Sequence, residues 1–167
     1  GGTYIDATMG NGHDTLFLCE LAGKEGQVLA FDIQKQALES TRALLKSEGM
    51  EQKARLILDS HENMAKYADE ASVDGICFNF GYLPGSDHSL ATKPESSKNA
   101  VIEGLRLLKK GGVMSLCIYS GGETGFEERD ILLAYLKSLD EKKYLVIVSA
   151  YYNRKNNPPI PVLIIKK

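Results

Sequence analysis

Residues 4–15 read Tyr4-Ile5-Asp6-Ala7-Thr8-Met9-Gly10-Asn11-Gly12-His13-Asp14-Thr15, and this stretch decides the fold. Its first residues favour a β-strand, and its two glycines permit positive φ angles and a close approach of the backbone to a ligand. Asp14 or Thr15 can cap the helix that the following apolar residues predict. A strand, a glycine turn and a helix N-terminus together form a pocket for a nucleotide-like ligand, although an ordinary strand-to-helix turn would use the same residues.

Two acidic residues flank this turn and narrow the class of ligand. Asp6 lies four residues before the first glycine, and Asp32 follows the apolar run 28–31, twenty residues after Gly12. A carboxylate at the tip of the second strand can accept hydrogen bonds from both hydroxyls of a ribose. A nicotinamide-binding turn would have a third glycine where this chain has Thr15, so the pattern disfavours a pyrophosphate site.

Strand and helix patterns alternate along the whole chain. We expect strands at 3–8, 27–32, 55–59, 73–80, 113–119, 144–151 and 160–166, and helices at 14–23, 35–48, 62–70, 94–109 and 124–139. Strands separated by helices imply a parallel sheet, whereas the last two strands have no helix between them and must be antiparallel. The prediction is one α/β domain over residues 1–167, with a mostly parallel seven-stranded sheet, a C-terminal antiparallel hairpin and helices on both faces.

The composition excludes several classes of protein. A formal net charge of −2 gives no general attraction to nucleic acid, so an RNA substrate would need a local basic patch. The three cysteines, Cys19, Cys77 and Cys117, lie in apolar runs and are expected to be reduced core residues of a cytoplasmic protein. No run has transmembrane length, which predicts no membrane partner. His13 and His61 lack metal-ligand spacing, so no metal is expected.

The spacing Asp-x-x-x-Gly-x-Gly, followed by the acid after the second strand, resembles class I S-adenosylmethionine (SAM)-dependent methyltransferases, which have a Rossmann-like fold. This resemblance implies SAM as the cofactor, with the glycine turn facing its methionine part and sugar. Such enzymes usually place a helix before the first strand. Because this sequence opens almost directly into that strand, we expect an N-terminal helix to be missing from it.

Polar residues end the predicted strands, and in a parallel sheet these ends share one edge. They are Asp6, Asp32, Asp59, Asn79 and Tyr119-Ser120. Asp59, followed by Ser60 and His61, is expected to cap a short helix, to accept a hydrogen bond from an adenine amine as in many methyltransferases, or both.

The stretch after the fourth predicted strand reads Asn79-Phe80-Gly81-Tyr82-Leu83-Pro84-Gly85-Ser86-Asp87-His88. Methyltransferases that act on amines often carry Asn-Pro-Pro-Tyr here, where the Asn oxygen accepts a hydrogen bond from the amine. Asn79 and Tyr82 match this pattern, while Phe80 and Gly81 replace the prolines. Tyr82 would pack on the substrate or simply pack in the fold, and His88 would shuttle a proton or be an ordinary loop histidine.

Four stretches, 6–15, 31–34, 59–62 and 79–88, together resemble the bacterial rRNA methylase family, whose members are understood as MnmM-type tRNA wobble-uridine methyltransferases. The resemblance implies methylation of a 5-aminomethyl group, with catalytic roles for Asn79, Tyr82 and His88. It implies cofactor binding by Asp6, Gly10, Asn11, Gly12, Asp14, Thr15, Asp32, Ile33, Gln34, Asp59, Ser60, His61 and Asn79.

The partner implied by this resemblance is a tRNA anticodon stem-loop. A flipped-out base could stack on Tyr82 or on Tyr151-Tyr152, beside Pro84. Arg154 and Lys155, in the turn between the last two strands, are expected to contact the RNA backbone or to be solvated turn residues.

Two other functions stay open: a methyltransferase acting on rRNA or a small amine, and a non-catalytic SAM- or RNA-binding module. The antiparallel edge could also pair two subunits in a homodimer. Glu127 and Glu128 lie near the start of a predicted helix. We expect their carboxylates to interact favourably with the helix dipole and to have no function in the site.

Overall fold

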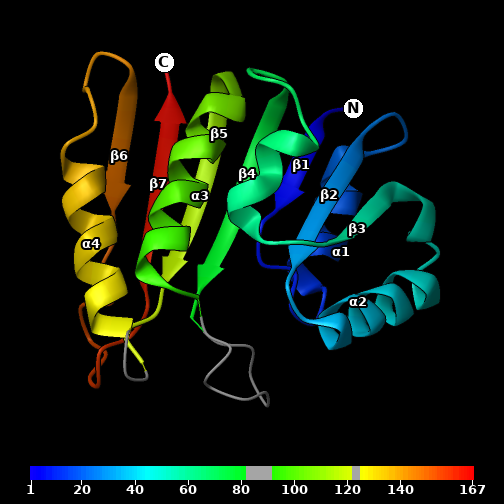
Figure 1. Ribbon diagram of the computed structural model, residues 1–167, viewed down its shortest axis with the longest axis horizontal. Coiled ribbons are helices and arrows are strands. Elements are labelled where there is room, and N and C mark those ends of the chain that lie inside the picture. The colour runs from blue at the N-terminus through cyan, green and yellow to red at the C-terminus, as the bar shows by residue number, and fades with distance from the viewer. Residues whose placement is uncertain (82–91, 122–124) are drawn as a thin grey trace.

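The computed structural model describes residues 1–81, 92–121 and 125–167, which build an α/β structure around one sheet (Figure 1). The strands are β1 (Thr3–Asp6), β2 (Gln27–Asp32), β3 (Ala54–Leu58), β4 (Val73–Phe80), β5 (Leu108–Ile118), β6 (Tyr144–Val148) and β7 (Ile160–Lys166). The helices are α1 (His13–Ala22), α2 (Lys35–Ser47), α3 (Pro94–Leu107) and α4 (Gly125–Lys137), with 3-10 helices η1 (Glu51–Lys53) and η2 (His61–Lys66).

The seven strands lie in the order β3-β2-β1-β4-β5-β7-β6. The strands β1 to β5 pair in parallel, whereas β7 is antiparallel to both of its neighbours. Consecutive strands joined by a helix run in parallel because each crossover returns the chain to the same end of the sheet. The predicted fold class, a mostly parallel sheet with a C-terminal antiparallel hairpin, is therefore confirmed.

Helices cover both faces of the sheet. In Figure 1, α3 and α4 lie in front of the strands and α1 lies behind them. The main core lies between the sheet and the front helices, and its largest fully buried side chains include Phe31, Phe78 and Phe80. The carboxyl ends of β1, β2, β4 and β5 meet at one edge of the sheet, which is where an open parallel sheet binds its ligand.

The passage from α3 to β5 differs from the expectation of a helix to residue 109 and a strand from 113. α3 ends at Leu107, and the fully buried Leu108 pairs at once with Val73 of β4. The register then shifts, so that the next pair joins Gly75 to Val113 and the residues between bulge outward. Burial of Leu108 outweighs the local helical pattern, because burying a side chain of this size stabilises the fold by about 2 kcal/mol relative to leaving it in water.

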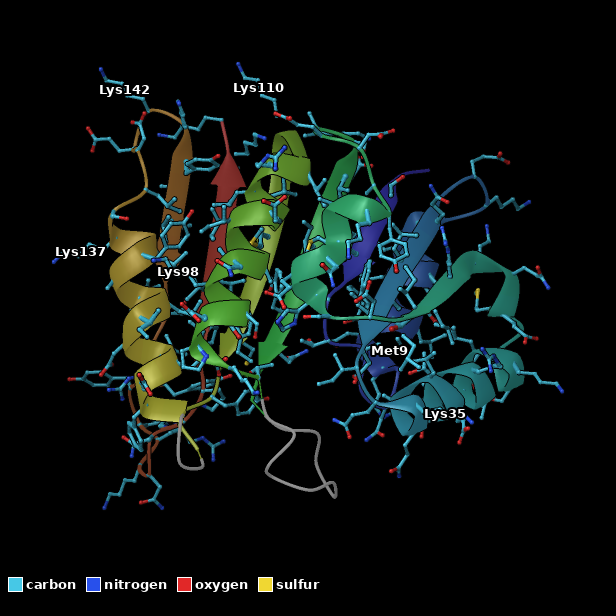
Figure 2. The ribbon with its side chains drawn as sticks, in the orientation of Figure 1. Met9, Lys35, Lys98, Lys110, Lys137 and Lys142 are labelled. Carbon is cyan, nitrogen blue, oxygen red and sulfur yellow. The ribbon has the colours of Figure 1, made fainter. Side chains whose placement is uncertain are left out.

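The lysines labelled in Figure 2 do not form one patch. Lys110 and Lys142 project from the top edge of the fold, Lys137 from the left and Lys35 from the lower right.

Among the described residues, no helix combines the length and the apolar character that a membrane span requires.

Candidate functional site

A cavity of about 890 Å³ lies at the carboxyl ends of β1, β2, β4 and β5, which is a volume typical of a cofactor site. Three segments supply most of the residues predicted to bind a cofactor: the turn after β1, the tip of β2 and the start of η2. The predicted residues that line it are Gly10, Asn11, Asp14, Asp32, Ile33, Gln34, Asp59, Ser60, His61 and Asn79.

The glycine turn after β1 fixes where α1 begins. Gly10 and Gly12 have φ angles of 50° and 87°, which a residue with a Cβ rarely adopts. A Cβ on Gly12 would also lie 2.9 Å from Cα of Thr41. Gly12 is the N-cap and α1 starts at His13, so the expectation that Asp14 or Thr15 caps this helix is wrong. Both side chains are therefore free to bind elsewhere.

Asp6 lies behind the cavity wall and holds the turn from inside. Its carboxylate is fully buried and accepts hydrogen bonds from Thr15 Oγ1 at 2.6 Å and from the Thr8 N–H at 3.2 Å. Burial, with a smaller effect of the Asp14 charge, raises the pKa of Asp6 to about 6, and its hydrogen bonds offset this only in part. Asp6, Gly12 and Thr15 are the three predicted cofactor residues that do not line the cavity. The geometry gives them a supporting position.

Asp32 joins the tip of β2 to the glycine turn. One carboxylate oxygen accepts from the Gly10 N–H at 3.1 Å, and the other accepts from the Gln34 N–H at 2.9 Å. Burial raises the pKa of this carboxyl above its ordinary value. Each oxygen has a second lone pair, so Asp32 can still accept hydrogen bonds from a ligand. Ile33 beside it is 58% exposed and adds an apolar wall to the cavity.

Asp59 organises the segment after β3. Its carboxylate accepts from Asn63 Nδ2 at 2.7 Å and from the Tyr67 hydroxyl at 2.9 Å. The hydrogen bond from Asn63, followed by that from Tyr67, lowers the pKa of Asp59. Ser60 is the N-cap residue of η2, but its side chain makes no capping hydrogen bond.

His61 is more a packing residue than a polar contact. Its side chain is buried, and its ring meets Phe78 and Phe80 edge-on with centroids 6.0 Å apart in each pair. Burial lowers its pKa, so the imidazole is neutral near pH 7. It presents a flat, uncharged surface to the cavity.

Asn79, on β4, faces α1 across the cavity. Its Nδ2 donates a hydrogen bond to Asp14 Oδ2 at 2.6 Å, and its backbone N–H donates to Thr8 Oγ1 at 2.7 Å. An ionised carboxylate only accepts hydrogen bonds, so the amide nitrogen must face Asp14. The Asn79 side-chain oxygen is thereby left as an acceptor. Tyr82, Pro84 and His88, which were predicted to lie nearby, are outside the described residues.

Several lining residues were missed by the sequence analysis. Asn156 and Asn157 come from the connection between β6 and β7, and their φ angles of 65° and 50° mark a tight turn. In the sequence they begin the run Asn156-Asn157-Pro158-Pro159, which is typical of a turn. Arg154 and Lys155 are exposed and precede them, but do not line the cavity. Tyr119 and Ser120, which were expected at this edge of the sheet, also line the cavity. The other lining residues, none of them predicted to bind the cofactor, are Ala7, Thr8, Met9, His13, Glu62, Gly81, Thr92, Lys93, Ser96, Gly121 and Phe126.

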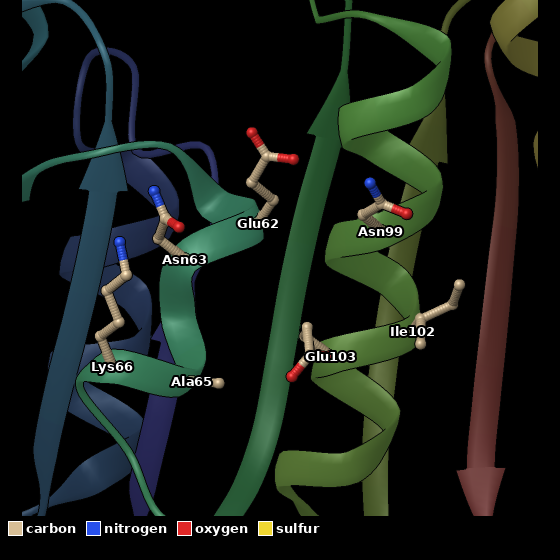
Figure 3. A pocket seen from close by; sticks show the side chains of 7 residues that line it. All are labelled: Glu62, Asn63, Ala65, Lys66, Asn99, Ile102 and Glu103. Carbon is tan, nitrogen blue, oxygen red and sulfur yellow. The ribbon is translucent and has the colours of Figure 1, made fainter.

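A second hollow of about 350 Å³ lies between η2 and α3 (Figure 3). Its walls mix two carboxylates, one ammonium and two amides, from Glu62, Asn63, Ala65, Lys66, Asn99, Ile102 and Glu103. Such a mixture indicates a solvated groove between two helices. Within the described part of the chain, no three His, Cys, Asp or Glu side chains converge as a metal site would require.

Residues 28–165 match the protein family described as "Putative rRNA methylase". A chloroplastic tRNA (mnm(5)s(2)U34)-methyltransferase of Arabidopsis thaliana is 36% identical over 173 residues, which are 98% of this chain and 62% of the relative. The chain thus spans less than two thirds of the length of that relative.

Two solved structures are also similar. A putative rRNA-methylase from Clostridium thermocellum is 44% identical with a TM-score of 0.96, covering 99% of this chain and 89% of that one. SMU.1697c, a putative methyltransferase from Streptococcus mutans in complex with SAH, is 37% identical with a TM-score of 0.90, covering 100% and 89%. The chain has the class I SAM-dependent methyltransferase fold and belongs to the rRNA methylase family.

Proposed function

We propose that this protein is a SAM-dependent methyltransferase that converts the 5-aminomethyl group of a tRNA wobble uridine to 5-methylaminomethyl, with 5-aminomethyl-2-thiouridine as the substrate nucleoside. The proposal rests most on the oriented acceptor of Asn79 at the wall of a nucleoside-sized cavity. The similarity to the Arabidopsis thaliana tRNA (mnm(5)s(2)U34)-methyltransferase supports this choice of substrate.

The cavity residues suit the three parts of SAM. The turn at Gly10 and Asn11 allows the methionine part to approach the backbone closely. The free lone pairs of Asp32 would accept hydrogen bonds from the ribose hydroxyls, while backbone N–H groups hold both of its oxygens in position. The segment of Asp59 and the neutral ring of His61 would surround the adenine.

Asn79 would orient the reacting amine. In methyl transfer the nitrogen lone pair attacks the methyl carbon as the carbon–sulfur bond breaks, and S-adenosylhomocysteine leaves. The product ammonium then releases its extra proton. Because the sulfonium is already a good leaving group, alignment of the lone pair supplies most of the acceleration. The Asn79 oxygen would accept an N–H of the amine, and Asp14 would keep the amide from rotating. His88 as proton shuttle and Tyr82 as a packing surface stay predictions.

The RNA would enter over the β6–β7 turn. Arg154 and Lys155 are exposed there and lie directly before the lining residues Asn156 and Asn157, so they could contact phosphates flanking a flipped base. Tyr152 is fully exposed and offers a ring for stacking. Pro84 as a substrate contact, a cytoplasmic location and a homodimer stay predictions.

A ribosomal RNA acceptor is the second candidate. The ribosomal RNA small subunit methyltransferase H of Streptococcus mutans is 33% identical over 84 residues, which are 48% of this chain and only 26% of that relative. The tRNA proposal is favoured because the similarity to the tRNA methyltransferase extends over 98% of the chain.

The test is methyl transfer from labelled SAM by the purified protein. One reaction contains tRNA that carries 5-aminomethyl-2-thiouridine, and matched reactions contain ribosomal RNA or tRNA that lacks the aminomethyl group. Nucleoside mass spectrometry should find 5-methylaminomethyl-2-thiouridine in the first reaction alone. Transfer to ribosomal RNA instead would support the second candidate, and SAM binding without transfer to any RNA would support a non-catalytic module.

A further inference from the structure

A buried carboxylate on α4 lies outside the cavity and has no role in the proposed chemistry. Glu128 is 1% exposed, and its two oxygens accept hydrogen bonds from Ser97 Oγ at 2.5 Å and from Thr92 Oγ1 at 2.9 Å. Over residues 1–81, 92–121 and 125–167, it takes part in no ion pair with a lysine or arginine. The sequence analysis expected only a favourable interaction of this acid with the helix dipole and did not predict its burial.

Stability of the fold does not explain why an acid occupies this buried position. Burial of an ionised carboxylate is unfavourable even when hydroxyls satisfy it, and an apolar residue of similar volume would often be more stable. Burial accordingly raises the pKa of Glu128, against the opposing effect of the hydrogen bonds from Ser97 and Thr92. The carboxylate fixes the direction in which two hydroxyl groups donate their hydrogen bonds.

The Thr92 hydroxyl connects the Glu128 carboxylate to the end of β4 through hydrogen bonds. It has one proton, and the short contact with Glu128 takes it, because a carboxylate only accepts. Its lone pair then accepts the N–H of Gly81 at 2.9 Å. The backbone N–H of Thr92 donates in return to the Gly81 carbonyl at 2.9 Å, which closes a ring between the two residues.

Both ends of this ring lie at the wall of the cavity. Gly81 and Thr92 line it, and Gly81 follows Asn79 by two residues along the chain. Thr92 directly precedes the turn into α3, whose Ser97 is held by the same carboxylate. Glu128 therefore ties β4, α3 and α4 together at the point where the amine acceptor is presented.

We propose that Glu128 is a positioning residue for the acceptor end of the cavity. Through the Thr92 hydroxyl it fixes Gly81, and through Gly81 it fixes the Asn79 side chain relative to the methyl donor. This inference rests on the proposed function for its kinetic consequence, but its structural part can be measured without any activity.

The kinetic test compares Glu128→Ala and Glu128→Gln with a matched control, Glu127→Ala, which removes the exposed carboxylate one position earlier on α4. Glu128→Ala should lower kcat at least about 10-fold, because small misplacements of reacting groups have such effects. The Kd for SAM, measured by calorimetry, should stay within about 2-fold, because the loss of two hydrogen bonds that do not contact the ligand has little effect on binding. Glu127→Ala should leave both constants unchanged.

The conservative variant Glu128→Gln tests whether the hydrogen-bond acceptor or the negative charge of Glu128 is required. A glutamine at position 128 can turn its oxygen toward Thr92 and its amide nitrogen toward Ser97, so Glu128→Gln should restore most of kcat. Thr92→Val should reproduce the loss seen in Glu128→Ala, and the double variant should be no worse than either single one. Additive losses, an unrescued Glu128→Gln or a parallel loss of SAM affinity would overturn the proposal.

Amide hydrogen exchange tests the ring between Gly81 and Thr92 even when no activity is found. In folded Glu128→Ala, the Gly81 and Thr92 amides should exchange faster, whereas the amides of β1 and β2 should keep their protection. Unchanged exchange at Gly81 and Thr92 would overturn the inference, whatever the substrate is. A wild-type protein that transfers no methyl group to aminomethyl-tRNA would instead overturn the proposed function and leave the exchange result to decide this one.

Discussion

The pKa of Asp6 predicts how the stability of this protein should change with pH. Asp6 is fully buried, and its pKa of about 6 lies above the ordinary value of 3.8. The folded protein therefore holds this proton more tightly than the unfolded chain does. The stability that the proton contributes is fully present below pH 3.8 and is lost as the pH rises through 6. The whole difference corresponds to about 3 kcal/mol.

The perturbation is Asp6→Asn, which keeps the size of the side chain and removes its titration. Between pH 5 and 7 the unfolded chain stays ionised at this position, while the folded chain loses its proton. The wild-type protein should therefore lose about 1 kcal/mol more of its unfolding free energy over this range than Asp6→Asn does. The unfolding free energy of Asp6→Asn should also be lower than that of the wild type by a constant amount of about 1 kcal/mol, because the amide cannot accept from both Thr8 and Thr15.

The assay is urea unfolding followed by far-UV circular dichroism at several pH values, since the chain has no tryptophan for fluorescence. Other carboxyls with shifted pKa values, such as Asp59 and Asp74, titrate equally in both proteins and cancel in the difference. Parallel stability curves for wild type and Asp6→Asn between pH 5 and 7 would refute the reasoning. A wild-type curve that rises relative to the variant with increasing pH would also refute it, because the sign would be reversed.

Three further predictions concern the site and its RNA. Asp32→Ala should weaken SAM binding about 10- to 100-fold in calorimetry, since it removes charged acceptors for the ribose, and an unchanged Kd would exclude that role. Asn79→Ala should spare SAM affinity and slow single-turnover methyl transfer about 100-fold; equal losses in both would contradict its role at the amine. Arg154→Ala and Lys155→Ala should each reduce the slope of log K for tRNA against log salt by about 1, and unchanged slopes would place the RNA elsewhere.

The parts of this molecule that follow local rules could be predicted from the sequence. Alternating strands and helices lead to a parallel sheet, and the carboxyl ends of parallel strands meet at one edge. Asp32 and Asn79 could therefore be placed together at that edge, and both line the cavity. The hairpin followed from the absence of a helix between the last two strands.

The parts that depend on contacts between distant segments could not be predicted. The sequence shows Glu128 only as an acid near a helix start, whereas its buried contacts are with Ser97 and Thr92, 31 and 36 residues away in the chain. The bond between Asp14 and Asn79 spans 65 residues, so no local pattern indicates it. The end of α3 was misplaced for the same reason, because the pairing of Leu108 with Val73 overrides the helical pattern.

The first residue of α1 links the glycine turn to the amine acceptor. Had Asp14 been the N-cap, its carboxylate would accept from backbone N–H groups of the first turn and could not hold Asn79. Because Gly12 takes a left-handed conformation, the helix begins at His13 and Asp14 and Thr15 both fall in its first turn. Successive helical residues point about 100° apart, so Thr15 reaches the buried Asp6 while Asp14 reaches Asn79. The turn that would admit the proposed cofactor thus also sets the direction in which Asn79 would present its oxygen to the proposed substrate nitrogen.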